Sequence, residues 1–558
     1  MKNTGALSGP CAGLLLLLNT FAISACSQST TANDETLLDN AEPARIKAHV
    51  SFLADDLLEG RKPGEPGYDL AAIYVRSQLE QTGAAPLFGA EDFYHPVNLK
   101  RSERRSQEKI KIGSCKLSPD DPSLVFGPAL NSSGKQAVSA EAVFVGYGID
   151  APDYGIDDFA DIDVAGKVAV FLNGFPDALP GEVGAHYMLA KPQTAREHGA
   201  IGTIEVETRH SERRRPWTLI RQTFHGPVIN LSDPPAQISP LGNRADIRTY
   251  GEASHCLFEN SPQRLNHVLA LVDETDGSPG SFDLHTQVQF TRSNTDYQFT
   301  SPNVVASITG RKKSDDVGAV LLLAHLDHIG VDPQKAREGD GIYNGALDNA
   351  MGVSVLLEVA RTLKQQEDAL HRPVIFAFLT AEESGMIGSA KLAEELTRDY
   401  PGGIAAVINV DMPVVLHELK DVVAIGASHS TLGHLVERAA ATQELTHSPD
   451  PAPQEGRFTR SDHYRFVQYG VPAVSIAVGK MGDADGLGLA FGKSGYHQPT
   501  DDLSLPIDWQ AAADLTDFVT RLTWLVASSR EAPIWYEGSI FGDTFAPSAP
   551  KAKTGDEM

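Results

Sequence analysis

Cysteine is scarce in this sequence, with four residues among 558. Two of them lie in an apolar N-terminal run, so too few thiols remain for a zinc site built from cysteine. The other two, Cys115 and Cys256, could form a disulfide in an oxidising compartment. The sequence alone does not fix the distance between them, so the paired and the free states both remain open.

Positive charge is also in short supply. The chain has 47 lysines and arginines against 73 aspartates and glutamates, which gives a net charge of -26 and a pI of about 5.1. A surface this acidic repels phosphate backbones, so nucleic acid is not an expected partner. Two short basic clusters, KRSERR at 100–105 and ERRRPW at 212–217, are better interpreted as solvated loop charge than as an anion site.

Long hydrophobic runs are absent after the N-terminus. The first apolar run, CAGLLLLLNTFAISAC at 11–26, follows Lys2 and is too short to span a bilayer as a mature helix. It fits a secretory signal over residues 1–25. A polar segment, residues 26–42, follows and has the composition of a tether.

The end of this run, ISAC, resembles a bacterial lipobox. The resemblance implies cleavage before Cys26 and acylation of its thiol, so this lipid anchor would be the only contact with a membrane. Because Ser27 follows rather than aspartate, it also implies transfer to the outer membrane of a bacterial cell envelope, with the protein facing the periplasm or the exterior. An ordinary secretory signal cut nearby is the alternative.

The chain is too long for one hydrophobic core, so two or three domains are expected. Residues 43–110 begin with two amphipathic helices joined by a Gly/Pro loop. Residues 111–285 contain short β-rich runs and many turn residues, which predicts a separate β-rich domain. In residues 286–530 apolar strands alternate with helices, which predicts an α/β fold with a mostly parallel mixed sheet flanked by helices. The tail, residues 531–558, is expected to be partly disordered.

Charged and histidine side chains follow several apolar strands of the α/β part. Ligands of open α/β sheets bind beyond the carboxyl ends of the strands. AVLLLA is followed by HLDH, PVIFAFLT by AEE and IAAVINV by aspartate, while another aspartate in YNGALDNAMG precedes a helix. Their common edge favours one shared site over separate surface or capping roles. The residues are His325, Asp327, His328, Asp348, Glu382, Glu383 and Asp411.

These residue types suit a two-metal hydrolytic site. Histidines and carboxylates without cysteine are typical of catalytic zinc, and a pair of metals needs a bridging carboxylate. His325 and Asp327 are two residues apart on one strand face, so Asp327 can orient His325. Glu382 and Glu383 point different ways, so one can bind metal while the other accepts a proton from water. No G-x-S-x-G or H-E-x-x-H motif occurs, which argues against those hydrolase classes.

Six short motifs occur in an order typical of one family. AHLDHIG, GALDNAMGV, TAEESGMIGS, VINVDM, RSDHYRF and SGYHQPTDD together resemble the M28 family of zinc aminopeptidases. FLADDLLEGRKPGEPGYDLAA resembles the N-terminal helical segment of that family, and the region with VFVGYGIDAPDYG and AREHGAIGTI resembles a protease-associated (PA) domain. The resemblance implies a zinc exopeptidase fold, phosphorylase/hydrolase-like, with the PA domain inserted at residues 111–285.

The resemblance also implies two Zn²⁺ per chain and five metal ligands. Asp348 would bridge the metals, and Asp411 would bind the metal that Glu383 does not hold. His497 lies in an apparent loop, where the strand-end argument alone would not find it. His328 is not assigned to metal. The implied ligands are His325, Asp348, Glu383, Asp411 and His497.

Five further residues receive roles from the same motifs. Glu382 would be the general base, and Asp327 would orient the neighbouring histidine ligand. Tyr496 would donate a hydrogen bond to the developing oxyanion. His463 is not assigned to metal, but it and Asp462 could line the pocket.

The function implied is that of an envelope-anchored di-zinc exopeptidase acting on peptides. An aminopeptidase would release N-terminal amino acids by attack of a metal-bridging hydroxide, with Glu382 as general base. A carboxypeptidase or dipeptidase on the same scaffold is an alternative, because the metal ligands do not distinguish these activities. A glutaminyl cyclase-like acyltransferase with one zinc and a receptor-like protein without catalysis are further alternatives. The inserted domain is expected to restrict access or present substrate, and the oligomeric state is not indicated.

Overall fold

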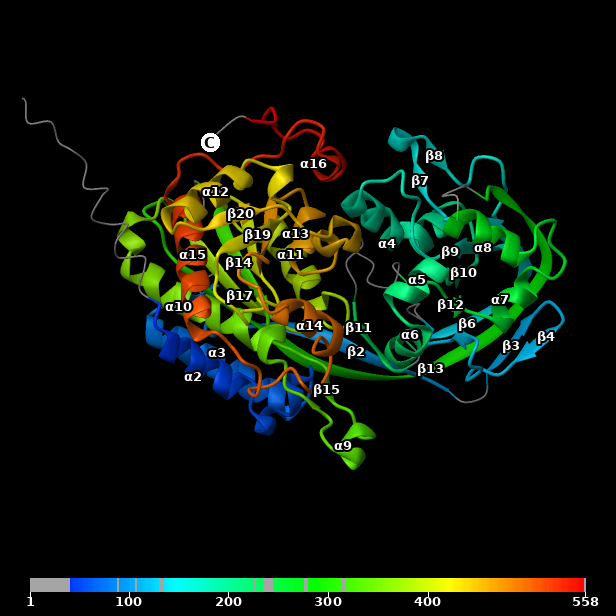
Figure 1. Ribbon diagram of the computed structural model, residues 1–558, viewed down its shortest axis with the longest axis horizontal. Helices are drawn as coiled ribbons and strands as arrows, with labels where there is room; N and C mark the ends of the chain where they lie inside the picture. Colours follow the sequence, from blue (N-terminus) through cyan, green and yellow to red (C-terminus); the bar gives the residue numbers. More distant parts are fainter. Residues whose placement is uncertain are drawn as a thin grey trace, which may run out of the picture.

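The chain forms two lobes that two long strands connect (Figure 1). The larger lobe holds residues 41–87, 228–231 and 303–555, and the smaller lobe holds residues 109–224 and 244–293. The predicted signal, Cys26 and nearly all of the tether lie outside the described residues. Among the helices described, none combines the length and apolar character needed to cross a bilayer. The computed structural model describes residues 41–87, 90–105, 108–129, 134–224, 226–233, 244–274, 279–312 and 317–555.

A mixed sheet forms the centre of the larger lobe. Four adjacent strands run parallel in the order β17 (Val374–Leu379), β14 (Ala319–His325), β18 (Ile404–Val410) and β21 (Ala473–Val478). Apart from Ile404 and the last two residues of β21, these strands are buried on both faces, as expected for a parallel sheet under helices. The flanking strands are β1 (Ala85–Pro86), β2 (Tyr94–Arg104), β11 (Val228–Leu231) and β13 (Ser281–Ile308) on one side and β19 (Asp421–Ile425) and β20 (Thr446–Ser448) on the other.

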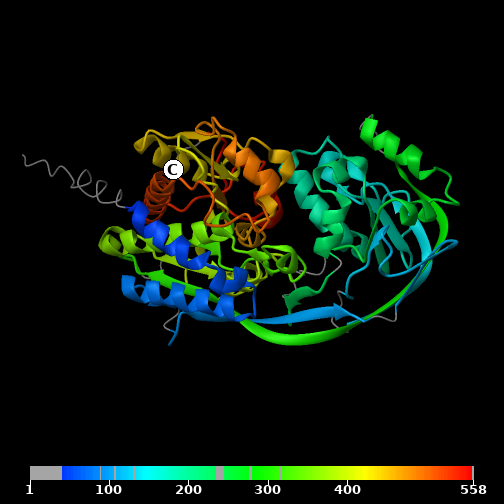
Figure 2. The same ribbon diagram turned by 60° about the horizontal axis from the view of Figure 1, so that its bottom comes forward.

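Helices cover both faces of this sheet (Figures 1 and 2). Alternate residues of β14 point to opposite faces: Leu322 packs in the core on one face and Leu321 in the core on the other. The first face is covered by α2 (Pro43–Leu53), α3 (Pro66–Thr82), α10 (Met351–Gln365), α12 (Leu432–Thr442) and α15 (Trp509–Ser528). The second face is covered by α11 (Ile387–Asp399), α13 (His463–Val467) and α16 (Ile540–Phe545). The mostly parallel α/β fold predicted from the sequence is confirmed.

The smaller lobe has a sheet and a core of its own. Its four parallel strands are β6 (Lys135–Val145), β9 (Val168–Leu172), β10 (Gly202–Val206) and β12 (Ile247–Thr249). β13 pairs with β6 and then continues into the larger lobe, where it pairs with β2 and β17. The remaining elements are β3 (Lys109–Ile112), β4 (Cys115–Leu117), β5 (Leu124–Val125), β7 (Asp150–Ala151), β8 (Ile156–Asp157), α4 (Gly181–Glu197), α5 (Arg209–Arg214), α6 (Trp217–Phe224), α7 (Glu252–Leu257) and α8 (Leu265–Glu274).

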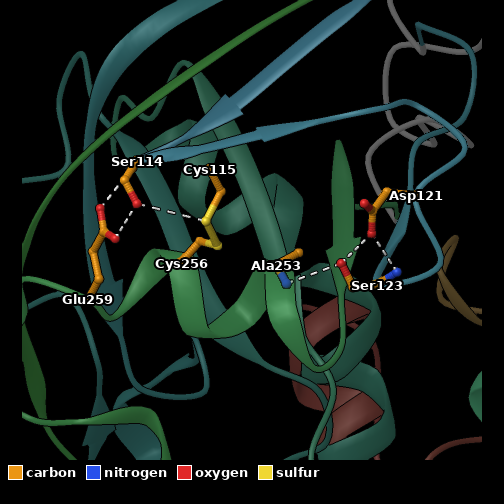
Figure 3. The surroundings of a disulfide bond; sticks show 7 residues. All are labelled: Ser114, Cys115, Asp121, Ser123, Ala253, Cys256 and Glu259. Atoms are coloured by element: carbon orange, nitrogen blue, oxygen red, sulfur yellow. Dashed lines mark hydrogen bonds between the residues drawn. A yellow bond between two sulfur atoms is a disulfide. The ribbon is translucent and has the colours of Figure 1, made fainter.

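A disulfide closes one end of the smaller lobe (Figure 3). It joins Cys115 on β4 to Cys256 on α7, with Cα atoms 6.2 Å apart. Beside it, the carboxylate of Glu259 accepts hydrogen bonds from the backbone N–H and the hydroxyl of Ser114, at 2.8 and 2.6 Å. The pair that the sequence left open is thus bonded across 141 residues of chain.

The structure differs from the sequence-based expectation in three places. The predicted boundary at residues 285 and 286 lies inside β13, which is continuous over 28 residues. The described residues of the smaller lobe form five α-helices in addition to its strands. The C-terminal tail, predicted to be partly disordered, packs on the larger lobe as far as the structure describes it, because Trp535 and Phe541 enter its core and Tyr536 pairs with Ala552.

Candidate metal and catalytic site

Three neighbouring parallel strands bring the predicted side chains together at their carboxyl ends. β14 ends at His325, β17 is followed by Glu382 and Glu383, and β18 is followed by Asp411. Because β14 lies between β17 and β18 and runs parallel to both, these residues emerge at one edge of the sheet. Asp348 reaches the same place from the segment that precedes α10.

A first triad consists of His325, Asp348 and Asp411. Nε2 of His325 lies 3.2 Å from Oδ1 of Asp348 and 3.0 Å from Oδ1 of Asp411. Burial opposes charge on His325, but the carboxylates of Asp411 and Asp348 outweigh it and hold the pKa of the imidazole well above its usual value. The triad therefore offers one nitrogen and two carboxylate oxygens to a cation.

A second triad shares Asp348 with the first. Nε2 of His497 lies 3.3 Å from Oδ2 of Asp348 and 3.1 Å from Oε2 of Glu383. Each oxygen of Asp348 thus faces a different histidine. His497 lies in a loop, so the ends of the strands alone could not identify it. In the structure it lies beside the residues that the strand ends did identify.

His328 also lies beside the second triad. Its Nδ1 is 2.6 Å from Oε1 of Glu383, and its ring meets that of His497 edge-on with centroids 5.8 Å apart. His328, Asp348 and Glu383 have ligand atoms close enough together to hold an ion. The sequence assigned His328 to no metal, although it occurs in the same motif as the first histidine, so the structure adds it to the candidate groups.

The segment that carries Asp348 is fixed by two hydrogen-bonding side chains. The carboxylate of Asp501 accepts from the backbone N–H groups of Leu347 and Asp348, at 2.9 and 3.0 Å. The amide of Asn349 donates to the backbone carbonyl of Val410 at 2.9 Å, which ties the segment to the end of β18. Asp501 was not predicted as a site residue, although it lies in the motif SGYHQPTDD beside the predicted loop ligand.

Arg61, at the end of η2 (Asp56–Arg61), supports two of these segments through their backbone. Its guanidinium donates to the carbonyls of Leu326, Asn344 and Gly345 at 2.9, 2.5 and 3.0 Å. Leu326 lies within AHLDHIG and Gly345 within GALDNAMGV, so one buried side chain joins two motifs. Arg61 was not predicted as a site residue, because its partners are backbone carbonyl groups, which every residue has.

Asp327 contacts the site differently from the sequence-based expectation. Its carboxylate accepts from the backbone N–H groups of Glu382 and Glu383, at 3.0 and 3.4 Å. The contact with His325 is made by the backbone carbonyl of Asp327, 3.1 Å from Nδ1. The residue therefore positions His325 through its main chain and the glutamate pair through its side chain.

Glu382 lies among further carboxylates. Burial raises its pKa well above the usual value, and Asp462 and Asp411 raise it further, against the effect of a nearby imidazole. The two pocket candidates, Asp462 and His463, have no surface open to solvent. Burial raises the pKa of Asp462 to about 7 and lowers that of His463 to about 4. Next to them, the hydroxyl of Ser461 donates to Oδ2 of Asp411 at 2.5 Å and so holds that carboxylate.

Tyr496 lies at the rim of the site. Its ring stacks on that of His497 with centroids 3.9 Å apart, and 37% of the residue is exposed. Loss of solvation raises the pKa of the phenol, and the charges of Asp348 and Glu383 raise it further. The phenol therefore stays protonated beside the two carboxylates, and its O–H group can donate a hydrogen bond.

Comparison with known proteins identifies the part of the chain that holds the site. Residues 303–523 match the model of Peptidase family M28. The chain therefore contains an M28 peptidase domain. Both triads, Glu382 and Tyr496 lie inside the matched residues, whereas Arg61 and the smaller lobe lie before them.

Several curated proteins are similar to parts of this chain. The probable lipoprotein aminopeptidase LpqL of Mycobacterium tuberculosis is 36% identical over 127 residues, 23% of this chain and 22% of that protein. Aminopeptidase Y of Saccharomyces cerevisiae is 28% identical over 229 residues, 40% of this chain and 39% of that protein. A glutamate carboxypeptidase 2 homolog of Caenorhabditis briggsae is 24% identical over 508 residues, 82% of this chain and 62% of that protein. The chain thus spans well under half the length of the first two relatives.

A solved structure extends the similarity to both lobes. The aminopeptidase from Aneurinibacillus sp. strain AM-1 aligns with 89% of this chain and 97% of its own, with a TM-score of 0.50 and 19% sequence identity. At this identity the match concerns the fold alone. The M28 domain and the smaller lobe together therefore form an arrangement that occurs in another protein.

Proposed function

We propose that the protein is a di-zinc exopeptidase, and that it acts as an aminopeptidase. The observation that carries the proposal is the spacing within the two triads. Tetrahedral zinc with ligands at about 2.0–2.1 Å separates its ligand atoms by about 3.3 Å. The histidine nitrogens of the triads lie 3.0–3.3 Å from their carboxylate oxygens, and Asp348 supplies one oxygen to each. This pattern fits two cations bridged by one carboxylate.

Each metal would be held by three side chains and would keep a position for water or substrate. One would be held by His325, Asp348 and Asp411, and the other by His497, Asp348 and Glu383. When bound, a zinc pair supplies positive charge that makes water more acidic and polarises a carbonyl. Nitrogen and carboxylate donors without thiolate suit zinc in a catalytic rather than a structural role.

The side chains around the triads would then carry the proton and the developing charge. Glu382 lies beside both triads without being needed as a ligand, and its raised pKa suits a group that accepts a proton and returns it to the leaving amine. Tyr496 would donate a hydrogen bond from its hydroxyl group to the developing oxyanion. Asp327 holds the backbone of Glu382 and so fixes the base relative to His325.

Aminopeptidase activity is proposed from the similar proteins. Two of the three curated relatives described above are named as aminopeptidases. The third is named as a glutamate carboxypeptidase homolog, so carboxypeptidase activity is the second candidate. The second triad argues against a cyclase-like acyltransferase with a single zinc, because a one-metal site would not need it.

We also propose that Cys26 carries a lipid anchor in a bacterial envelope and that the smaller lobe is a PA domain. The name of the LpqL relative, a probable lipoprotein, supports the first point. The parallel sheet of the smaller lobe and its position before the M28 domain support the second.

The direct test replaces Glu382 by Gln in the full chain loaded with zinc. We expect kcat to fall by about 100-fold or more, because a general base contributes that much, while both metals stay bound. Glu141→Gln, on the exposed surface of the smaller lobe, is the matched control. Normal turnover of the Glu382 variant would reject the role. Peptides blocked at the N-terminus or at the C-terminus distinguish the two activities: cleavage of N-blocked peptides alone would replace aminopeptidase by carboxypeptidase.

A further inference from the structure

A hairpin connects two of the motifs that form the metal site. It consists of β15 (Gly330–Val331), α9 (Lys335–Glu338) and β16 (Ile342–Tyr343), and it projects from the larger lobe in Figure 1. The hairpin begins shortly after His328 and ends shortly before Asp348. Both of its ends are therefore anchored at the site.

The base of the hairpin packs tightly against η2. Gly60 has a φ of 67°, and a Cβ added to it would lie 2.5 Å from the carbonyl oxygen of Tyr343 and 2.6 Å from that of Gly330. A side chain at this position would therefore displace both strands of the hairpin. The next residue, Arg61, holds the carbonyls of the segment that follows β16. The base of the hairpin is thus fixed in place.

The tip of the hairpin reaches the loop that carries His497. Nζ of Lys335 donates a hydrogen bond to Oε1 of Gln498, the residue after this histidine, at 3.0 Å. The same ammonium group lies 5.0 Å from the centre of the buried Tyr343 ring. The carboxylate of Asp332 accepts from the backbone N–H of Lys335 at 3.3 Å and so holds the start of α9. The lysine is therefore placed between the base of its own hairpin and the loop of a proposed zinc ligand.

The backbone of His497 needs support from its surroundings. Its φ is 54°, in the left-handed region that disfavours residues with a side chain, and such a conformation persists where neighbouring contacts hold it. On one side, the backbone N–H of Asp501 donates to the carbonyl of Gln498 at 3.1 Å, and its carboxylate binds the segment of Asp348. The hydrogen bond from Lys335 holds the side chain of Gln498 from the hairpin.

The two triads are supported by different groups. In the second triad, His497 is held through Gln498. In the first triad, Nδ1 of His325 lies 3.1 Å from the backbone carbonyl of Asp327, at the end of β14. The contact made by Lys335 therefore concerns one of the two proposed metals.

We propose that Lys335 is a positioning residue for the metal of the second triad. It fixes Gln498, and with it the backbone of His497, so that Nε2 of this histidine faces Asp348 and Glu383. The proposal rests on the di-zinc function and deepens it, because it makes the two metals unequal. One depends on a hairpin with an exposed tip, whereas the other is held at the ends of buried strands. Loss of the lysine should therefore lower the affinity for one zinc ion alone.

The test measures zinc affinity at each triad separately. His325→Ala leaves the second triad intact and His497→Ala leaves the first, so each variant serves as a background for Lys335→Met. In the His325→Ala chain, we expect Lys335→Met to weaken zinc binding by about 10–100-fold in competition with a chelator, as is typical when a group that orients a ligand is lost. In the His497→Ala chain the affinity should stay the same. Arg337→Met, exposed on α9, should change neither affinity.

Two further variants connect the effect to the hydrogen bond with Gln498. Lys335→Arg keeps a cationic donor and should keep the zinc affinity of the His325→Ala chain. Gln498→Leu should weaken zinc binding there as Lys335→Met does. The double variant should bind no more weakly than either single one, because both changes remove the same interaction. Additive losses would contradict an effect of the lysine through Gln498.

Two readouts keep this proposal separate from the peptidase function. Hydrolysis of an aminoacyl-anilide by the wild type tests peptidase activity by itself. Nuclear magnetic resonance of labelled histidine rings in the metal-free chain tests positioning without zinc or turnover. The signal of His497 should shift in Lys335→Met, while that of His325 should not. Where circular dichroism shows that Lys335→Met fails to fold, Gln498→Leu tests the same bond from the loop.

The outcomes that overturn the proposal are distinct from a failure of the peptidase function. An equal loss of zinc affinity in the two backgrounds would limit Lys335 to a structural role. Unchanged affinity in the His325→Ala background, or an unchanged His497 signal, would show that the hairpin does not position this histidine. Each of these results counts against the proposal whether or not the wild type hydrolyses the anilide.

Discussion

The two lobes use buried charge in opposite ways. In the smaller lobe, two buried arginines lie beside carboxylates: Arg292 lies 2.6 Å from Asp246, and Arg248 pairs with Glu205 and Glu207. In the larger lobe, four carboxylates meet three histidines at one sheet edge. Both groups of metal-type residues found in the described parts of the chain lie there. Removing one partner of a buried ion pair destabilises the fold, whereas buried carboxylates in excess of cationic side chains form a binding site for cations.

The largest effect on stability should come from a matched pair of the smaller lobe. Asp246→Ala leaves the guanidinium of Arg292 buried, at 4% exposure, without its carboxylate. We expect a loss of about 3–5 kcal/mol in the free energy of unfolding, since removing one partner of a buried pair costs that much. Zinc content should not change. Denaturant unfolding measures the stability, and metal analysis measures the zinc content. The control is Asp283→Ala, which removes the carboxylate of a half-exposed ion pair. Loss of zinc in Asp246→Ala would contradict the division between the lobes.

A smaller effect is expected at the contact between the lobes. His186 on α4 lies 2.6 Å from the hydroxyl of Tyr464, and burial lowers its pKa to about 4. The unfolded chain, with a histidine pKa near 6.5, binds a proton that the folded protein does not. The resulting stability is present above pH 6.5 and is lost as the pH falls toward 4, by at most about 3 kcal/mol.

His186→Gln should remove this pH dependence, because glutamine can still bond to the Tyr464 hydroxyl but does not ionise. Denaturant unfolding between pH 7 and pH 4 measures it, and the exposed His210→Gln is the control. An equal loss of stability with pH in the His186 variant and the wild type would show that another group is responsible.

The smallest predicted free-energy change concerns the support of the metal site. Arg61→Met removes the hydrogen bonds to the carbonyls of Leu326, Asn344 and Gly345. We expect zinc to bind about 10–100-fold more weakly, as is typical when a group that orients ligands is lost. Competition with a chelator measures the affinity, and Arg76→Met, on the surface of α3, is the control. A lower melting temperature with unchanged zinc affinity would limit Arg61 to a structural role.

The sequence predicted the α/β fold because hydrophobic periodicity and strand ends carry most of that information. Parallel strands place their carboxyl ends at one edge of a sheet. The residues at the ends of three strands, His325, Glu383 and Asp411, could therefore be predicted to lie together. His497 required the family resemblance, since nothing in a loop sequence indicates what the loop contacts. Arg61 was missed because it acts on backbone carbonyls, which leave no pattern in the sequence.

Long-range features of the smaller lobe were harder to predict. Proline cannot donate a hydrogen bond within a sheet, so Pro302 is an unexpected member of a long strand. In the structure it lies within β13 and pairs with Pro96 of β2, where neither residue has an N–H to satisfy. The disulfide partners are separated by 141 residues, and local patterns do not determine such a distance. Arg215, Arg244 and Arg248 likewise meet at the ring of Phe224 only through the fold.

The most direct test of the central claim is the number of zinc ions bound per chain, measured by atomic emission. We predict two for the wild type, and about one for both His325→Ala and His497→Ala, because each variant loses the histidine of one triad. His210→Ala, on an exposed surface, should keep two. A wild type that binds no zinc, or triad variants that bind as much as the wild type, would contradict the account.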